Sequence, residues 1–295
     1  MNIIITGGTG FIGEHLKKYL VTKNHHIFIV TRTPEQHKNT ENETYISYDI
    51  DTKDLPVIDG VINLAGESLF GYWTKEKKQK ILSSRISATR QVIDLIKRLE
   101  HKPEVFISGS AVGFYGSSTE HIFTENTTAS GEDFLSSVVA QWEDTASEAE
   151  SLGIRTIYAR FGIVLGKDGG SFPLMALPVK LFVGGKIGDG EQWISWIHIE
   201  DVVRLLDYCI YHKNISGPVN FTAPQPQRNK DFYRNLAKAA KRPYWFTTPA
   251  LLLISILGEM GQLITEGQYV LPQKAADHDF MFRYPQLKPA LKQLK

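Results

Sequence analysis

The sequence predicts an α/β fold, with a doubly wound parallel sheet and a smaller, mainly helical C-terminal lobe. Three observations predict it. Short apolar runs alternate with longer segments of helical periodicity through the first half of the chain, a pattern typical of a parallel sheet covered on both faces. The 295 residues include 42% hydrophobic and 22% charged positions, which is typical of a globular protein with one large core. After Leu165, glycine-rich turns and prolines become frequent, which indicates a change of architecture.

The expected elements follow in order along the chain. Helices are expected where apolar residues recur every three or four positions, as Ile12, Leu16 and Leu20 do, and strands where short apolar runs lack that spacing. The expected strands are 2–6, 26–31, 44–49, 57–65, 104–108, 155–160 and 219–222. The expected helices are 11–22, 75–99, 133–152 and 199–211.

The same pattern predicts two lobes. We expect residues 1–165 to form the sheet domain, with 199–222 returning to it, and residues 166–198 and 223–295 to form the smaller lobe. Within that lobe, residues 251–257 are strongly apolar, but this run is far shorter than the roughly 20 residues needed to span a bilayer. We predict a buried helix here, with an exposed docking face as the alternative.

A glycine-rich turn follows the first expected strand directly, in the sequence Thr6-Gly7-Gly8-Thr9-Gly10-Phe11-Ile12-Gly13. Glycine lets the turn tighten and lets backbone N–H groups approach a pyrophosphate, and the following helix offers its positive N-terminus. Strand, turn and helix together predict a Rossmann-like dinucleotide-binding domain. The residues expected to contact the cofactor here are Gly7, Thr9, Gly10, Phe11, Ile12 and Gly13; a turn without a ligand is the alternative.

The end of the second expected strand bears on which nicotinamide cofactor binds. Sites that prefer NAD usually carry Asp or Glu near this point to bind the ribose 2′-hydroxyl. This chain has Thr31 and Arg32 there instead. A hydroxyl and a guanidinium suit a dianionic 2′-phosphate, so we predict that Thr31 and Arg32 bind NADP(H). A solvated surface arginine is the alternative.

Further motifs in the same order resemble those of the extended, or atypical, short-chain dehydrogenase/reductases, the group that includes nucleotide-sugar epimerases and dehydratases. The turn above is similar to their N-terminal signature. The other matching segments are 61–66 (VINLAG), 108–116 (SGSAVGFYG), 188–192 (GDGEQ) and 196–202 (WIHIEDV). Several details resemble one branch, the epimerase-family proteins labelled cell-division-inhibitor-like, which have a C-terminal domain of unknown function: 71–74 (GYWT), 84–86 (SRI), 160–166 (RFGIVLG), 195–198 (SWIH) and 280–285 (FMFRYP).

The resemblance implies roles for individual residues. Leu64 and Ala65 would lie against the cofactor ribose, and Arg85 near the cofactor phosphates, with a solvated basic face as the alternative for Arg85. Arg160 ends an expected strand at the carboxyl edge of the sheet, where open α/β sheets bind ligands; its anionic partner is the cofactor, the substrate or a protein carboxylate. Ser110 occupies the position of the superfamily's catalytic serine, although a local structural role is an equal alternative.

The chain departs from the superfamily in its catalytic helix. The parent pattern is Tyr-x-x-x-Lys with a glutamate four residues beyond the lysine. Aligned on Glu143, the tyrosine position falls on Leu135 and the lysine position on Val139. Neither side chain can donate, accept or carry charge. Tyr115 is therefore our candidate for a replacement phenol, with a purely structural turn at its Tyr-Gly pair as the alternative.

Three functions remain open. The first is an NADP(H)-dependent epimerase or oxidoreductase acting on an unknown small, possibly sugar-like substrate, with Ser110 and Tyr115 as its catalytic residues. The second is a non-catalytic NADP(H)-binding redox sensor or regulatory protein. The third, an interaction role in cell division, is supported by no residue that we can name.

Composition excludes several other classes. The 33 Lys and Arg nearly balance the 32 Asp and Glu, so we expect no nucleic-acid partner. No signal peptide or spanning segment is recognised, and we expect a cytoplasmic protein without a membrane partner. The single Cys209 fits a reducing compartment and a buried structural role. The nine histidines are scattered, so no metal site is predicted. The oligomeric state is left open.

Overall fold

The computed structural model describes residues 1–294. Seven parallel strands form its main sheet in the order β12-β7-β5-β4-β1-β2-β3. The order changes direction between β1 and β4, which is the place where open α/β sheets bind their ligands. The strands are β1 (Asn2–Thr6), β2 (His26–Val30), β3 (Glu43–Ile46), β4 (Gly60–Asn63), β5 (Val105–Ala111), β7 (Arg155–Phe161) and β12 (Gly217–Phe221).

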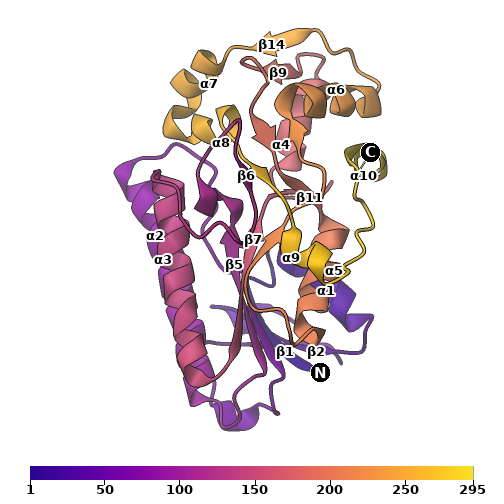
Figure 1. Ribbon diagram of the computed structural model, residues 1–295. Coiled ribbons are helices and arrows are strands. Elements are labelled where there is room, and N and C mark those ends of the chain that lie inside the picture. The colour runs from indigo at the N-terminus through magenta and orange to yellow at the C-terminus, as the bar shows by residue number, and fades with distance from the viewer. Residues whose placement is uncertain (295) are drawn as a thin grey trace.

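Helices cover both faces of this sheet (Figure 1). Helices α1 (Phe11–Val21) and α5 (Ile199–Tyr211) pack together on one face, and α2 (Lys75–Arg98) and α3 (Phe134–Ser147) on the other. Alternation along β1 shows the two layers, because Ile3 and Ile5 pack into the core cluster that contains α5, whereas Ile4 packs with Val92 and Ile96 of α2. The predicted doubly wound parallel sheet is confirmed.

Element boundaries differ from the expected ones where tertiary pairing decides them. The apolar run 57–65 pairs in the sheet only over Gly60–Asn63. Val57 precedes the sheet and is 58% exposed, and Leu64 turns away while its N–H donates to the Thr6 carbonyl. Helix α3 ends at Ser147 and a 3-10 turn continues to Leu152.

The C-terminal lobe has its own apolar core, built around the fully buried side chains of Trp196 and Phe232. Its helices are α4 (Phe172–Lys180), α6 (Asn229–Ala240), α7 (Ala250–Leu257), α8 (Gln262–Thr265) and α10 (Leu287–Gln293). Short strand pairs link them: β8 (Ile163–Leu165) with β11 (Trp196–His198), β9 (Gly185–Ile187) with β14 (Phe246–Thr248), β10 (Trp193–Ile194) with β13 (Gln227–Arg228), and β6 (Ile122–Phe123) with β15 (Tyr269–Val270). Helix α9 (Gln273–Asp277) packs instead on β12, with Ala275 in the core of the sheet domain.

Two buried residues at the start of α5 fasten the C-terminal segment to the sheet domain. The Asp201 carboxylate accepts the backbone N–H groups of Arg283 at 2.7 Å and Tyr284 at 2.8 Å. His198 caps α5 by accepting the Glu200 N–H at 3.2 Å through Nδ1, and its Nε2 lies 3.0 Å from the Gln293 side-chain oxygen. Burial lowers the pKa of His198, so the imidazole is neutral. These contacts give both residues a structural role.

The prediction that residues 251–257 form a buried helix is wrong. They form helix α7, but none of its residues is buried. Leu253 packs against the core of the lobe, and Leu257 packs against the cluster around Trp73 and Met260, whereas Leu251 is 80% exposed and Ile256 61% exposed. An apolar run predicts burial only where another element covers it, and only one side of α7 is covered. Within residues 1–294, no helix is long and apolar enough to cross a membrane.

Candidate functional site

The glycine turn between β1 and α1 has the backbone geometry expected of an anion-binding site and lies at the switch point of the sheet. Gly7 has φ +66°, and a Cβ on it would lie 2.6 Å from the Leu64 carbonyl. A Cβ on Gly13 would lie 2.3 Å from the Gly7 oxygen, so α1 packs directly on the turn. No side chain caps α1 after Gly10. The first N–H groups of the helix therefore remain available to a pyrophosphate.

Other residues of the turn have distinct environments. Thr9 is exposed, and Ile12 is half-buried against the main core. The Phe11 ring packs on the loop after β8, since a Cβ on Gly166 or Gly169 would lie 2.4 or 2.5 Å from it. This loop therefore covers the start of α1. Because the Phe11 side chain packs on this loop, only its backbone N–H is left to contact a cofactor.

The carboxyl end of β2 is followed by a hydroxyl and a guanidinium, on Thr31 and Arg32. Thr31 is half-buried, and its hydroxyl accepts the Thr33 N–H at 3.4 Å. Arg32 is exposed. Within residues 1–294 it makes no side-chain hydrogen bond or salt bridge. This arrangement fits a 2′-phosphate, which needs charge-assisted donors.

The end of β4 is fixed by a buried polar network. The Asn63 side chain accepts the Thr6 hydroxyl at 2.6 Å and donates to the Thr89 hydroxyl at 2.9 Å. Trp142 of α3 donates to the same Thr89 oxygen at 3.0 Å. The network sets the path of Leu64–Ala65, the segment expected to contact the ribose. Sequence reasoning missed Thr89 and Trp142, because isolated polar and aromatic residues within helices carry no local signal.

Arg85 of α2 lies over the same segment. A Cβ on Gly66 would be 3.5 Å from the Arg85 side chain, and the guanidinium stands 5.3 Å from the centre of the Trp142 ring. Its one hydrogen bond runs to the Ile81 carbonyl at 2.9 Å, and burial lowers its pKa. Within the described residues it has no salt bridge. A half-buried cation without a carboxylate partner favours a phosphate ligand.

Arg160 of β7, by contrast, has a protein carboxylate as its partner. Its Nε and Nη2 donate to the two Glu143 oxygens at 2.7 Å each. The two side chains are 4% and 11% exposed, and the guanidinium stacks 3.6 Å from the centre of the Phe114 ring. Nη1 is buried without a partner among residues 1–294. Contact between Arg160 and the cofactor stays a prediction that rests on this one nitrogen.

The two candidate catalytic hydroxyls belong to the same polar cluster. Ser110 of β5 donates to Glu143 at 2.5 Å. The Tyr115 phenol donates to the Asn220 side-chain oxygen at 2.8 Å, and the Asn220 N–H donates to the buried Glu125 carboxylate at 2.9 Å. Burial raises the pKa of Tyr115, so its phenol is protonated at neutral pH. Sequence reasoning used Glu143 only for alignment and did not single out Asn220 or Glu125.

The positions of the missing catalytic pair are filled by packing. Leu135 joins an apolar cluster with Trp73 and Met260. Val139 is 4% exposed and packs in a cluster with Tyr115. Both lie on α3 and have apolar neighbours. Cys209 is fully buried, as expected, and burial raises the pKa of its thiol to about 12, which agrees with a structural role.

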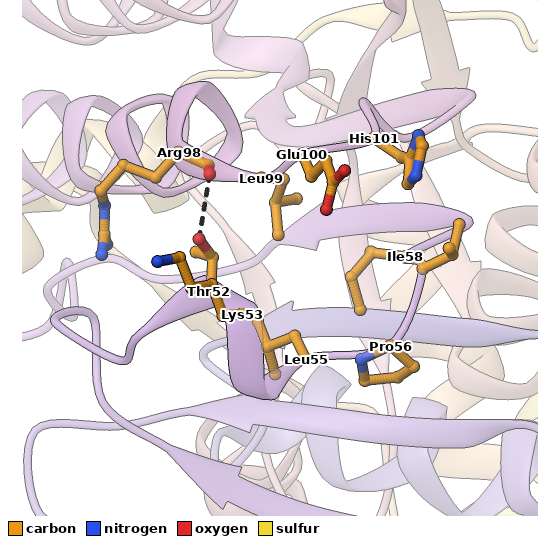
Figure 2. A pocket seen from close by; sticks show the side chains of 10 residues that line it. Thr52, Lys53, Leu55, Pro56, Ile58, Arg98, Leu99, Glu100 and His101 are labelled. Carbon is orange, nitrogen blue, oxygen red and sulfur yellow. Dashed lines mark hydrogen bonds between the residues drawn. The ribbon is translucent and has the colours of Figure 1, made fainter.

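Two cavities lie away from the glycine turn. One, of about 440 Å³, lies between the segment after Tyr115 and the C-terminal lobe. Its lining is polar and comprises Ser117, Ser118, Thr119, Glu120, Gln192, Thr265, Glu266 and Gly267. The other, of about 410 Å³, lies between the segment before β4 and the end of α2 (Figure 2). Thr52 and Arg98 close one side of it through a 2.9 Å hydrogen bond. This second cavity is at the amino edge of the sheet, opposite the ligand edge.

Comparison with known sequences agrees with this geometry. The pattern of the NAD dependent epimerase/dehydratase family matches residues 3–221. The chain belongs to this family. A second pattern, a domain of unknown function named DUF1731, matches residues 248–294. Epimerase family protein YfhF of Bacillus subtilis is 47% identical over 100% of this chain and 98% of its own length, and epimerase family protein SH2119 of Staphylococcus haemolyticus is 42% identical over 99% and 98%.

Solved structures show the same fold. Human epimerase family protein SDR39U1, crystallised with NADPH, superposes with a TM-score of 0.89 at 29% identity, over 100% of this chain and 99% of that one. UDP-glucuronic acid 4-epimerase of Bacillus cereus, crystallised with UDP-glucuronic acid and NAD, gives a TM-score of 0.76 at 19% identity, over 99% of this chain and 97% of that one. The family binds a nicotinamide cofactor; the two neighbours differ in which one they hold.

Proposed function

We propose that this chain is an NADP(H)-dependent oxidoreductase or epimerase acting on a small, possibly sugar-like molecule without the usual Tyr-x-x-x-Lys pair. The observation that carries the cofactor assignment is the pair of arginines at the switch point. Arg32 beside Thr31 and Arg85 beside Leu64–Ala65 both lack a carboxylate partner within residues 1–294. The cofactor in the human relative, NADPH, supports the same choice.

The hydrogen bonds around Ser110 limit what it can do. Arg160 donates to both oxygens of Glu143, and Ser110 donates its single proton to the same carboxyl group. Its oxygen then retains lone pairs that can accept a hydrogen bond from a substrate hydroxyl. The bound nicotinamide supplies the hydride acceptor or donor. Ser110 and Glu143 together thus form a path by which a hydroxyl proton could leave a substrate, a role that tyrosine and lysine have elsewhere in the superfamily.

Titration with NADPH and with NADH, followed by nicotinamide fluorescence, tests the cofactor assignment. We expect tighter binding of NADPH, and about a tenfold to hundredfold loss of NADPH affinity in Arg32→Ala with NADH affinity unchanged, because a charge-assisted phosphate contact contributes about 1.5–3 kcal/mol. Arg90→Ala removes another exposed arginine and is the matched control. Equal affinities for the two nucleotides in wild type would refute the NADP(H) assignment.

A non-catalytic NADP(H) sensor is the second candidate. It is favoured by the burial of both candidate hydroxyls, Ser110 at 3% and Tyr115 at 4% exposure, and by the packed Leu135 and Val139. A screen of carbonyl and sugar substrates for NADPH oxidation or epimerisation, repeated with Ser110→Ala/Tyr115→Phe, separates the two. Turnover that this double variant abolishes supports the enzyme. NADPH binding without turnover, unchanged in the variant, supports the sensor.

A further inference from the structure

Helix α7 is apolar at every position except Ser255 and nevertheless has no buried residue. Besides Leu251 and Ile256, Leu252 is 49% exposed and Ile254 40% exposed. A helix that is apolar all round is normally found inside a protein core or a membrane. Its exposure on a folded chain indicates a surface that another body covers.

The exposed apolar surface continues beyond α7 onto its neighbours. Trp245 is 75% exposed and its indole donates to the Phe182 carbonyl at 2.9 Å. Strand β14, which contains Phe246, pairs with β9 directly after the exposed residues 181–183. We define the apolar tip as Leu181, Phe182, Val183, Trp245, Phe246, Leu251, Leu252, Ile254 and Ile256. In Figure 1 it lies at the top, around α7, β14 and β9, at the opposite end from the N-terminus.

Basic residues outnumber acidic ones around the apolar tip. Two acidic residues at its margin are paired, Asp231 with Arg234 and Glu259 with Lys78. Residues 232–258 contain no Asp or Glu, and neither do residues 172–188. The basic residues in these two ranges are Lys180, Lys186, Arg234, Lys238, Lys241 and Arg242. Lys180, Lys241 and Arg242 are exposed, and Arg242 stacks 4.3 Å from the centre of the Phe182 ring within the tip. Because the whole chain has a net charge of only +1, this is a local basic region.

The charge pattern decides among possible occupants. A second copy of the chain would bring like charges together across the interface, which is unfavourable. A membrane with anionic lipids offers the complementary charge and an apolar layer directly beneath it. Exposed Leu and Ile side chains flanked by Trp, Lys and Arg are the features of segments that lie in the interface plane of a bilayer.

We propose that the apolar tip docks this chain onto the surface of membranes that contain anionic lipids, with α7 lying in the interface. Eight residues of helix cannot span a bilayer, but lying in the interface does not require a span. The proposal therefore departs from the expectation of no membrane partner, which rested on the absence of a spanning segment. It does not depend on the cofactor or on catalysis.

Co-sedimentation of the full chain with vesicles tests this. We expect binding to phosphatidylglycerol–phosphatidylcholine vesicles, little binding to phosphatidylcholine alone, and weakening by salt. Leu251→Asp/Ile256→Asp should lower the partition coefficient at least about tenfold, and Lys241→Glu/Arg242→Glu should lower it on anionic vesicles only. Val57→Asp, a similarly exposed apolar site at the amino edge of the sheet, is the control. Thermal melting of each variant verifies folding.

Three results would overturn the proposal. The first is wild-type protein that stays in the supernatant with anionic vesicles at low salt. The second is unchanged binding by folded Leu251→Asp/Ile256→Asp, which would leave only non-specific electrostatic attraction. The third is a dimer in sedimentation velocity that this variant dissociates, without vesicle binding, which would make a second copy the occupant of the apolar tip.

Discussion

Replacing each of two glycines in the glycine turn by alanine should affect different properties: one substitution should lower stability and the other should lower NADPH affinity. Gly13 is enclosed: its Cβ would lie 2.3 Å from the Gly7 oxygen and 2.6 Å from the Gly8 Cα. Gly10 is open, with φ −84° and the Gly7 oxygen at 3.2 Å as the one neighbour of its Cβ. Gly13 therefore serves packing, while we expect the open space beside Gly10 to be the approach for a pyrophosphate.

The magnitudes follow from these contacts. Ordinary van der Waals contact begins at 3.4 Å, so Gly13→Ala requires α1 to shift by about 1 Å against backbone atoms. Overpacking of this kind costs about 1–3 kcal/mol, and rigid backbone obstacles favour the upper end. Gly10→Ala should change the free energy of unfolding by less than about 1 kcal/mol, because its conformation already suits alanine.

Denaturant unfolding and NADPH titration of both variants measure the two effects. We expect Gly13→Ala to lose about 2–3 kcal/mol of stability, and Gly10→Ala to keep its stability while its NADPH affinity falls at least about tenfold, because the methyl group occupies the pyrophosphate approach. The reasoning is refuted if Gly10→Ala binds NADPH like wild type, or if Gly13→Ala is as stable as wild type.

Three further predictions concern the buried polar contacts. Glu143→Gln should lower the free energy of unfolding by about 3 kcal/mol, because it leaves the buried Arg160 cation without its carboxylate. Ser110→Ala should lower the free energy of unfolding by only about 1 kcal/mol. Equal losses of stability in chemical denaturation would contradict this. Asp201→Asn should loosen the C-terminal segment, because an amide nitrogen cannot accept hydrogen bonds from the N–H groups of residues 283 and 284. Limited proteolysis should cut this segment faster in the variant. Unchanged cleavage would show that Asp201 does not hold the segment in place. Burial lowers the pKa of His198 below its ordinary 6.5, so as the pH falls this histidine is protonated in the unfolded chain before it is protonated in the folded one. The free energy of unfolding should therefore fall as the pH drops from about 7 to 5. His198→Asn should flatten this dependence on pH, and an unchanged dependence would assign it to other groups such as His25.

The limits of sequence reasoning show in particular residues. The turn from Gly7 to Gly13 could be interpreted correctly because strand, glycines and helix are contiguous, so its geometry is set by local conformational preference. The partner of Arg160 could not be chosen, because Glu143 lies on another element and its distance depends on how α3 packs against β7. The burial of α7 was predicted wrongly for the same reason, since periodicity and hydropathy describe a segment but not what covers it.

The sequence alone determined the doubly wound sheet, the dinucleotide turn and the family, because these depend on local periodicity and on motifs read in order. Only the tertiary structure decided which cations are paired and which are free, that Ser110 donates to Glu143, and that a basic, apolar surface is exposed at the end of the C-terminal lobe. These properties come from contacts between residues far apart in the chain, such as Asn63 with Thr89 or Trp245 with Phe182. Such contacts exist only once the elements have packed.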